Sequence, residues 1–184
     1  MSICLMGVSC SGKDTITKEL QDMGYRRIVT YTTRNPRPNE VDGVDYHFVT
    51  KEQFLHMVEN REFAEWRDYN TVDGIWYYGS RIADYNCDKK SVIILTPDGY
   101  KEASKNVEAL VSIYLHVKNK ELKRRSKIRD VDKKEARRRR RADKKDFKGV
   151  IRIADYVIDN TKTDAYTVAS ICNEMNGIGK RKNV

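Results

Sequence analysis

A long hydrophobic run is missing from this chain, because no apolar stretch approaches the roughly 18 residues of a membrane-spanning helix. The N-terminus has no basic stretch before an apolar core and no small-residue cleavage site, so no signal peptide is expected. Cysteine is scarce, and the four cysteines show neither a C-x-x-C pair nor the spacing of a zinc site. They are Cys4, Cys10, Cys87 and Cys172. These absences predict a cytoplasmic protein with reduced thiols and no membrane partner.

Acidic residues are fewer than basic ones: the chain has 27 aspartates and glutamates and 36 lysines and arginines, which gives a net charge of +9. Residues 118–148 carry most of the excess, including the run Arg137–Arg141. A basic segment of this kind is a solvated helix face or a site for nucleic acid or nucleotide phosphates. No aromatic residue interleaves the arginine run, so the sequence does not favour a nucleic-acid partner.

Strands and helices are expected to alternate along most of the 184 residues, which fit one domain. Apolar runs predict strands at 2–6, 91–95 and 109–117, and two further strands are expected at 25–31 and 155–160. Helices are expected at 13–23, 51–63, 81–88, 97–106, 163–176 and, in two pieces, 119–147. This alternation favours the α/β class with a parallel sheet. Residues 33–88 do not show this alternation and predict an inserted subdomain. Within it, residues 65–80 predict a hairpin with a turn at Asp73–Gly74. Residues 177–184 are expected to fray.

The stretch "GVSCSGKDT", residues 7–15, lies between the first predicted strand and the first predicted helix. Its spacing is that of a G-x-x-x-x-G-K phosphate loop, in which backbone N–H groups and a helix N-terminus bind phosphate. Gly7 and Gly12 permit the tight path, and Lys13 can reach the outer phosphates. The sequence therefore predicts a nucleotide phosphate site here.

Four further blocks follow in order between residues 30 and 80: "TTRNPR", "VDGVDYHF", "EFAEW" and "YYGS". With the phosphate loop, they closely resemble the guanylate kinase family over residues 1 to about 160. The resemblance implies a P-loop NTPase core whose parallel sheet is flanked by helices, a mixed α/β insert that binds a nucleotide, and a helical lid. The core would comprise 1–32, 89–117 and 149–176, the insert 33–88 and the lid 118–148.

The resemblance also implies a pocket for the acceptor nucleoside monophosphate. Arg34 and Arg37 would grip its phosphate, and Tyr46 and Tyr78 would hydrogen-bond it. Glu65 would read the base, since a carboxylate accepts from guanine N1–H and N2–H together. The other residues assigned to this pocket are Thr30, Gly79, Ser80 and Thr96.

The donor ATP is expected on the phosphate loop. The residues assigned to it are Gly7, Ser9, Ser11, Gly12, Lys13, Asp14, Thr15 and Asn160. An arginine-rich lid would close over the donor phosphates, supply positive charge and exclude water. Arg125 and Arg129 stand where this lid begins, and Arg138 matches a catalytic arginine of the family. Together with Lys13 and Arg34, these three are the expected catalytic residues.

Three departures from the family pattern stand out. Asp14 replaces the hydroxyl residue that normally ligates magnesium, and Ile94 and Thr96 replace two carboxylates at a strand end. The link between Trp66 and Tyr77 is also longer than usual. Since magnesium readily takes carboxylate oxygen, our hypothesis is that Asp14 holds Mg²⁺ and compensates for the missing strand acid. The change at Thr96 weakens the selection of guanine.

The sequence thus predicts ATP-dependent phosphoryl transfer to a nucleoside monophosphate, GMP or dGMP in the leading interpretation. Because of Asp14 and Thr96, a kinase of other or several deoxynucleotides stays open. A non-catalytic guanylate-kinase-like binding module is a third interpretation, although such modules typically lose the phosphate loop that is intact here. Nucleic-acid binding through the basic segment is the fourth.

Overall fold

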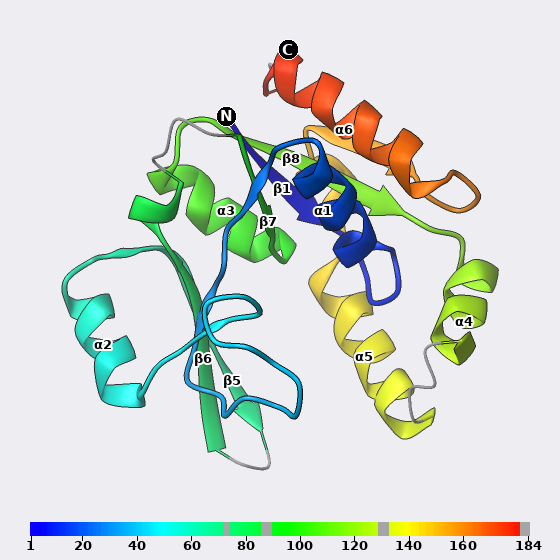
Figure 1. Cartoon of the computed structure of the whole chain (residues 1–184). Coiled ribbons are helices and arrows are strands. Elements are labelled where there is room, and N and C mark those ends of the chain that lie inside the picture. The colour runs from blue at the N-terminus through cyan, green and yellow to red at the C-terminus, as the bar shows by residue number, and fades with distance from the viewer. Residues whose placement is uncertain (72–73, 86–89, 129–132, 181–184) are drawn as a thin grey trace.

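The computed structural model describes residues 1–71, 74–85, 90–128 and 133–180. Its core is a five-stranded sheet in the order β2-β7-β1-β8-β9, in which all neighbouring strands are parallel (Figure 1). The strands are β1 (Ser2–Met6), β2 (Arg26–Arg27), β7 (Ser91–Ile94), β8 (Leu110–His116) and β9 (Tyr156–Asp159). The parallel sheet with flanking helices confirms the predicted α/β class.

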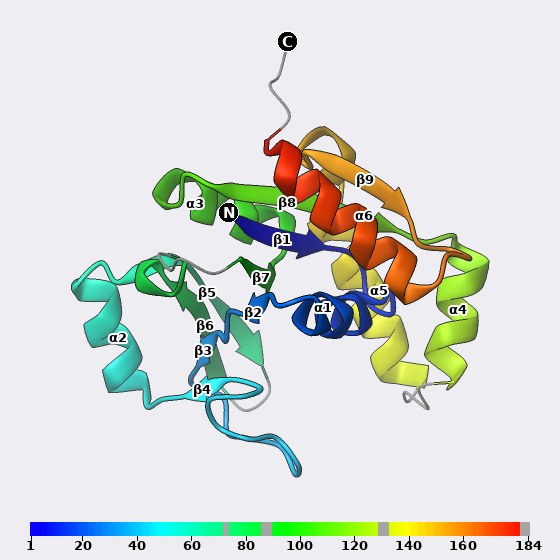
Figure 2. The same cartoon turned by 45° about the horizontal axis from the view of Figure 1, so that its top comes forward.

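Helices cover both faces of this sheet, which explains why its central strand β1 is apolar from Ile3 to Met6. In β1, Ile3 and Leu5 face a core cluster that includes residues of α1 (Lys13–Asp22) and α6 (Ala165–Ile178). Cys4 and Met6 alternate with them and face a second cluster that includes residues of α3 (Pro97–Asn106). Figure 2 shows α6 over β1 and β8.

A second sheet, in the order β4-β3-β6-β5, forms beside the core. Its strands are β3 (Tyr31–Thr32), β4 (His47–Phe48), β5 (Phe63–Thr71) and β6 (Gly74–Arg81), and the helix α2 (Lys51–Glu59) precedes β5. The antiparallel pairing of β5 with β6 confirms the predicted hairpin, while Asp73 of its predicted turn lies outside the described residues. In Figure 1 β5 and β6 extend downward from the core sheet, and α2 lies to their left.

The basic segment forms two helices, as predicted: α4 (Asn119–Ile128) and α5 (Lys133–Asp146). A short 3-10 turn, η2 (Val150–Arg152), follows α5 and leads to β9. Within the described ranges, no helix is long and apolar enough to cross a membrane. The described cysteines, Cys4, Cys10 and Cys172, are free thiols, and Cys87 lies outside the described residues.

Several element boundaries differ from the sequence prediction. The strand expected at 25–31 is wrong as one element: after the Ile28 N–H donates to Val92 O at 2.9 Å, the chain leaves the core sheet and joins the second sheet as β3. The helix expected at 51–63 ends at Glu59, because Arg61 adopts a left-handed conformation (φ +55°) before β5. Of the helix expected at 81–88, the structure has the 3-10 turn η1 (Ile82–Asp84), and residues 86–89 lie outside its description.

The closing helix is also displaced, by two residues at each end. It begins after Asp164, whose side chain accepts from the backbone N–H of Thr167 and caps the helix. It runs on to Ile178, so the first two residues of the tail expected to fray are helical. Residues 181–184 lie outside the described part.

Candidate functional site

The loop between β1 and α1 has the tight path that its glycines predicted. Gly12 adopts a left-handed conformation with φ +97°, as does Cys10 with φ +65°. A Cβ at Gly7 would lie 2.3 Å from the Oγ of Ser11, so a side chain cannot fit there without a shift. The Ser11 Oγ is buried and has no hydrogen-bond partner among the described residues. The loop therefore closes tightly at the end of β1.

A cavity of about 770 Å³ opens beside this loop, and we call it the donor cavity. The predicted ATP residues that line it are Ser9, Gly12, Lys13, Asp14, Thr15 and Asn160. Gly7 and Ser11 are part of the loop but not of the lining. The Lys13 Nζ donates to Gly7 O at 2.7 Å and to Val8 O at 3.2 Å, so the ammonium lies over the loop.

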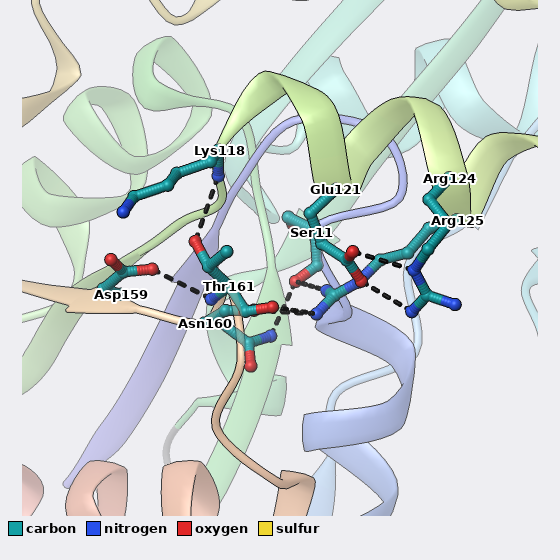
Figure 3. A network of polar contacts seen from close by, with 8 residues as sticks. All are labelled: Ser11, Lys118, Glu121, Arg124, Arg125, Asp159, Asn160 and Thr161. Atoms are coloured by element: carbon teal, nitrogen blue, oxygen red, sulfur yellow. Dashed lines mark hydrogen bonds and ion pairs between the residues drawn. The ribbon is translucent and has the colours of Figure 1, made fainter.

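A polar network ties α4 to the phosphate loop (Figure 3). Arg125 donates from Nη2 to Asn160 O at 2.8 Å and from Nη1 to Ser11 O at 3.4 Å. The side-chain amide of Asn160 donates to the same Ser11 carbonyl at 2.8 Å. Glu121 accepts from Arg124 and from the Nε of Arg125, and these two arginines lower the pKa of Glu121 to about 2. Arg125 is thereby fixed against the loop, although it lies more than 100 residues further along the chain.

The helix α5 contributes residues to two cavities. Arg139 lines the donor cavity, and Arg138 lines a second cavity of about 400 Å³ next to the hairpin β5–β6. Asp143 accepts from the backbone N–H of Ser9 at 2.9 Å, which joins α5 to the phosphate loop. Arg129, predicted to be catalytic, lies outside the described residues.

The second cavity, which we call the acceptor cavity, collects most of the residues predicted to bind the monophosphate. Those that line it are Thr30, Arg37, Tyr46, Glu65, Tyr78, Gly79 and Thr96. Ile94, one of the two replacements for a strand acid, lines it as well. At Gly79, a Cβ would lie 2.8 Å from the Phe63 ring, so glycine is required there. The structure thus brings together residues from four separate blocks of the sequence.

Arg34 differs from this group because it does not line the cavity. Its side chain is only 5% exposed and forms an ion pair with Glu40, with 2.9 Å between Nη2 and Oε1. Its guanidinium also lies 5.4 Å from the centre of the Tyr46 ring. Arg34 therefore lies against the ring of Tyr46, which lines the cavity.

The base reader predicted from the sequence, Glu65, is 6% exposed and has a perturbed pKa. Burial raises the pKa of its carboxyl to about 7, while the hydrogen bond from Ser80 and the charge of Arg67 act in the opposite direction. Ser80 Oγ donates to Glu65 Oε1 at 2.8 Å and lies 2.8 Å from the hydroxyl of Tyr85. This chain of contacts fixes the carboxylate at one end of the acceptor cavity.

Several residues that line the two cavities or contact site residues were not identified from the sequence. Arg67, Tyr69, Trp76 and Arg139 line a cavity. Glu40, Tyr85, Glu121 and Asp143 bond to Arg34, Ser80, Arg125 and Ser9, respectively. Three of these, Arg67, Tyr69 and Trp76, lie in the long link between Trp66 and Tyr77 that departs from the family pattern, so that link was the available signal. The others are ordinary charged or aromatic residues that the sequence does not distinguish.

The donor cavity contains side chains that suit magnesium. Asp14 and Thr15 line it beside Lys13, at the start of α1. The described residues contain no group of three or more His, Cys, Asp or Glu side chains that could hold a metal ion by themselves. Magnesium at nucleotide sites typically uses one or two carboxylates together with phosphate oxygens and water. One carboxylate beside a hydroxyl therefore fits magnesium that arrives with a nucleotide.

Comparison with known proteins places this geometry in a family. The model of the guanylate kinase family matches residues 1–173. The chain is 33% identical to the guanylate kinase of Prochlorococcus marinus over 145 residues, which cover 75% of this chain and 77% of that protein. It is 34% identical to the guanylate kinase of Paramagnetospirillum magneticum over 170 residues, 89% of this chain and 78% of that protein.

The fold agrees with these sequence relationships. The crystal structure of guanylate kinase from Anaplasma phagocytophilum superposes with a TM-score of 0.70 at 23% identity, covering 97% of this chain and 85% of that one. At this identity the superposition shows a common fold, and the family follows from the sequence matches. The phosphate loop, the hairpin and the basic helices follow one another along the chain in the order that the resemblance implied. On the family model and the two sequence matches, the chain belongs to the guanylate kinase family.

Proposed function

We propose that this protein transfers the γ-phosphoryl group of ATP to GMP or dGMP, directly and without a covalent enzyme intermediate. The proposal rests on the position of α5, because two neighbouring arginines of this helix line different cavities. Arg139 lines the donor cavity, and Arg138 lines the acceptor cavity. Phosphoryl transfer needs alignment and positive charge between donor and acceptor more than covalent chemistry. A cationic helix that lines both cavities supplies both.

In this proposal ATP lies in the donor cavity. Backbone N–H groups of the loop and the N-terminus of α1 bind its phosphates, and Lys13 reaches the outer ones. To do so, the Lys13 ammonium exchanges its bonds to the Gly7 and Val8 carbonyls for phosphate oxygen. Asp14 would hold Mg²⁺, which supplies positive charge to the phosphate oxygens when it is bound with ATP.

The monophosphate lies in the acceptor cavity. Arg37, Tyr46 and Tyr78 would bind its phosphate, and Arg34 would add positive charge from its place against the Tyr46 ring. The ionised Glu65 would accept from guanine N1–H and N2–H at the other end. Residues 33–88 thus act as the acceptor insert, 118–148 as the lid, and 1–32, 89–117 and 149–176 as the core. Within the lid, Arg125, Arg129 and Arg138 act on the phosphates. We expect this reaction in the cytoplasm.

A panel of nucleoside monophosphates, with ADP release as the readout, tests the proposal. GMP and dGMP should be the best acceptors, and Arg138→Ala should lower kcat more than it raises KM for either substrate. Arg141→Ala is the matched control, because Arg141 is exposed on the same helix and lines neither cavity. GMP binding without any ADP production would favour the non-catalytic module instead.

The role of Asp14 has its own test. Asp14→Ala should raise the magnesium concentration needed for half-maximal turnover, because the remaining ligands hold the metal less tightly. An unchanged rate with an unchanged magnesium dependence would remove Asp14 from the metal site and leave the kinase proposal standing.

A kinase of broader specificity is the second candidate. It is favoured by Thr96 and Ile94, which line the acceptor cavity and cannot provide the carboxylates that the family pattern has there. The same panel decides, because comparable turnover of several bases would support it.

A further inference from the structure

Arg67 occupies a place in the acceptor cavity that the sequence did not reveal. Side chains alternate along a strand, so Glu65, Arg67 and Tyr69 of β5 share one face, and all three line the cavity. Their partners on β6 are Ser80, Tyr78 and Trp76 respectively. Arg67 is therefore the next inward-facing residue after the base-reading carboxylate.

The guanidinium of Arg67 can donate a further hydrogen bond from its Nε. Its side chain is 28% exposed, and its Nε is buried with no hydrogen-bond partner among the described residues. It forms an ion pair with Asp98 at 3.6 Å, which is too long for a hydrogen bond, and Asp98 itself is 61% exposed. A buried N–H without a partner is costly, so an acceptor atom on a ligand would be bound favourably.

Thr96 adds a second donor on the same side of the cavity. It is the N-cap of α3, and its Oγ1 accepts from the backbone N–H of Gly99 at 3.2 Å. The hydroxyl hydrogen stays available to donate. The base end of the cavity thus combines a carboxylate acceptor, Glu65, with the donors Arg67 and Thr96.

This arrangement is complementary to a ring N–H with a carbonyl beside it. In thymine and uracil, the N3–H has a carbonyl on each side. In guanine, one neighbour of N1–H is a carbonyl and the other is an amino group, which itself needs an acceptor. Adenine and cytosine have no ring N–H on this edge. We propose that Arg67 donates to a ring carbonyl of the acceptor base, and that thymine and uracil nucleotides are substrates alongside guanine nucleotides.

This inference rests on the proposed kinase function. Its test measures kcat/KM for GMP, dTMP, UMP, AMP and CMP in the wild-type protein and in Arg67→Met, which keeps the length of the side chain and removes its donors. The wild type should phosphorylate dTMP and UMP far better than AMP and CMP. Arg67→Met should lower kcat/KM for dTMP and UMP about 10- to 100-fold, the usual effect of a lost hydrogen bond to a charged group, and that for GMP by less.

Lys101→Ala is the matched control, because Lys101 pairs with the same Asp98 carboxylate at 3.6 Å but does not line the cavity. It should leave the ranking of the bases unchanged. If Arg67→Met does not fold, Arg67→Lys keeps the positive charge and loses the planar fork, and a selective loss of dTMP and UMP turnover is again expected.

Two outcomes would overturn the assignment. The first is turnover of GMP without turnover of dTMP or UMP. The second is an equal loss of kcat/KM for all nucleotides in Arg67→Met, which would mean that the guanidinium binds the phosphate or only stabilises the fold. If no monophosphate is phosphorylated, the kinase proposal itself fails. Calorimetric binding of dTMP to the wild type and Arg67→Met then tests Arg67 alone, and equal affinities would reject it.

Discussion

Replacing Glu65 by glutamine should change stability and activity in opposite directions. The carboxyl of Glu65 is 6% exposed, and its burial raises the pKa from 4.5 to about 7. In the folded protein the protonated form is therefore favoured relative to the unfolded chain. The stability associated with this proton is complete below pH 4.5 and is lost as the pH rises toward 7. Glutamine keeps the shape and an oxygen for Ser80, but it does not ionise.

The size of the effect follows from the two pKa values. A shift from 4.5 to about 7 corresponds to about 3 kcal/mol once the carboxyl is fully ionised in both states. About 2 kcal/mol of this difference develops between roughly pH 5.5 and pH 8. The free energy of unfolding of Glu65→Gln minus that of the wild type should therefore increase by about 2 kcal/mol over this range.

Urea unfolding at both pH values measures this difference, and Glu102→Gln is the control because its carboxylate is 50% exposed. In the same variant, kcat/KM for GMP should fall at least about 100-fold, since the amide cannot accept from two N–H groups of guanine. In the wild type, kcat/KM for GMP should decrease below about pH 7 as Glu65 becomes protonated. A stability difference that is the same at both pH values, or a flat activity profile between pH 6 and 8, would refute this account.

The other predictions concern the donor side. Arg125→Ala should lower kcat/KM for ATP about 10-fold or more, because two carbonyls at the phosphate loop lose a charged donor. Arg124→Ala should be nearly neutral in the same ATP titration, since its side chain is 62% exposed. Gly12→Ala should abolish ATP binding in calorimetry and lower the melting temperature. Gly12 has a φ of +97°, and the new Cβ would lie 2.7 Å from the side-chain Nδ2 of Asn160. Gly177→Ala, in the open at the end of α6, should instead be neutral or stabilise by a few tenths of a kcal/mol to about 1 kcal/mol in thermal unfolding.

Features that depend on neighbouring residues could be predicted from the sequence alone. The phosphate loop is local, since Gly7 and Gly12 set the backbone path and the helix begins at Lys13. The hairpin β5–β6 and the two basic helices also follow from runs of adjacent residues. The blocks that carry the family resemblance are of the same kind, so the acceptor residues could be named before their positions in space were known.

Features that depend on distant parts of the chain were decided by the tertiary structure. Residues 25–31 are rich in β-branched and aromatic residues and suit one strand, yet hydrogen bonding to β7 ends at Ile28 and the chain passes into the second sheet. The sequence gives no means of telling which of the five arginines at 137–141 face a cavity. Only the packing of α5 places Arg138 and Arg139 in different cavities.

The same distinction applies to the base end of the acceptor cavity. From the sequence, the family resemblance predicted that the Glu65 carboxylate reads the base, and it indicated that Thr96 replaces an acid. It could not indicate that Arg67 lines the same cavity with a buried N–H for which the described part of the chain provides no partner. Nor could it indicate that Thr96 Oγ1 accepts from the backbone N–H of Gly99. Hydrogen-bonding state and burial depend on which strands and helices meet, and therefore only the folded chain decides them.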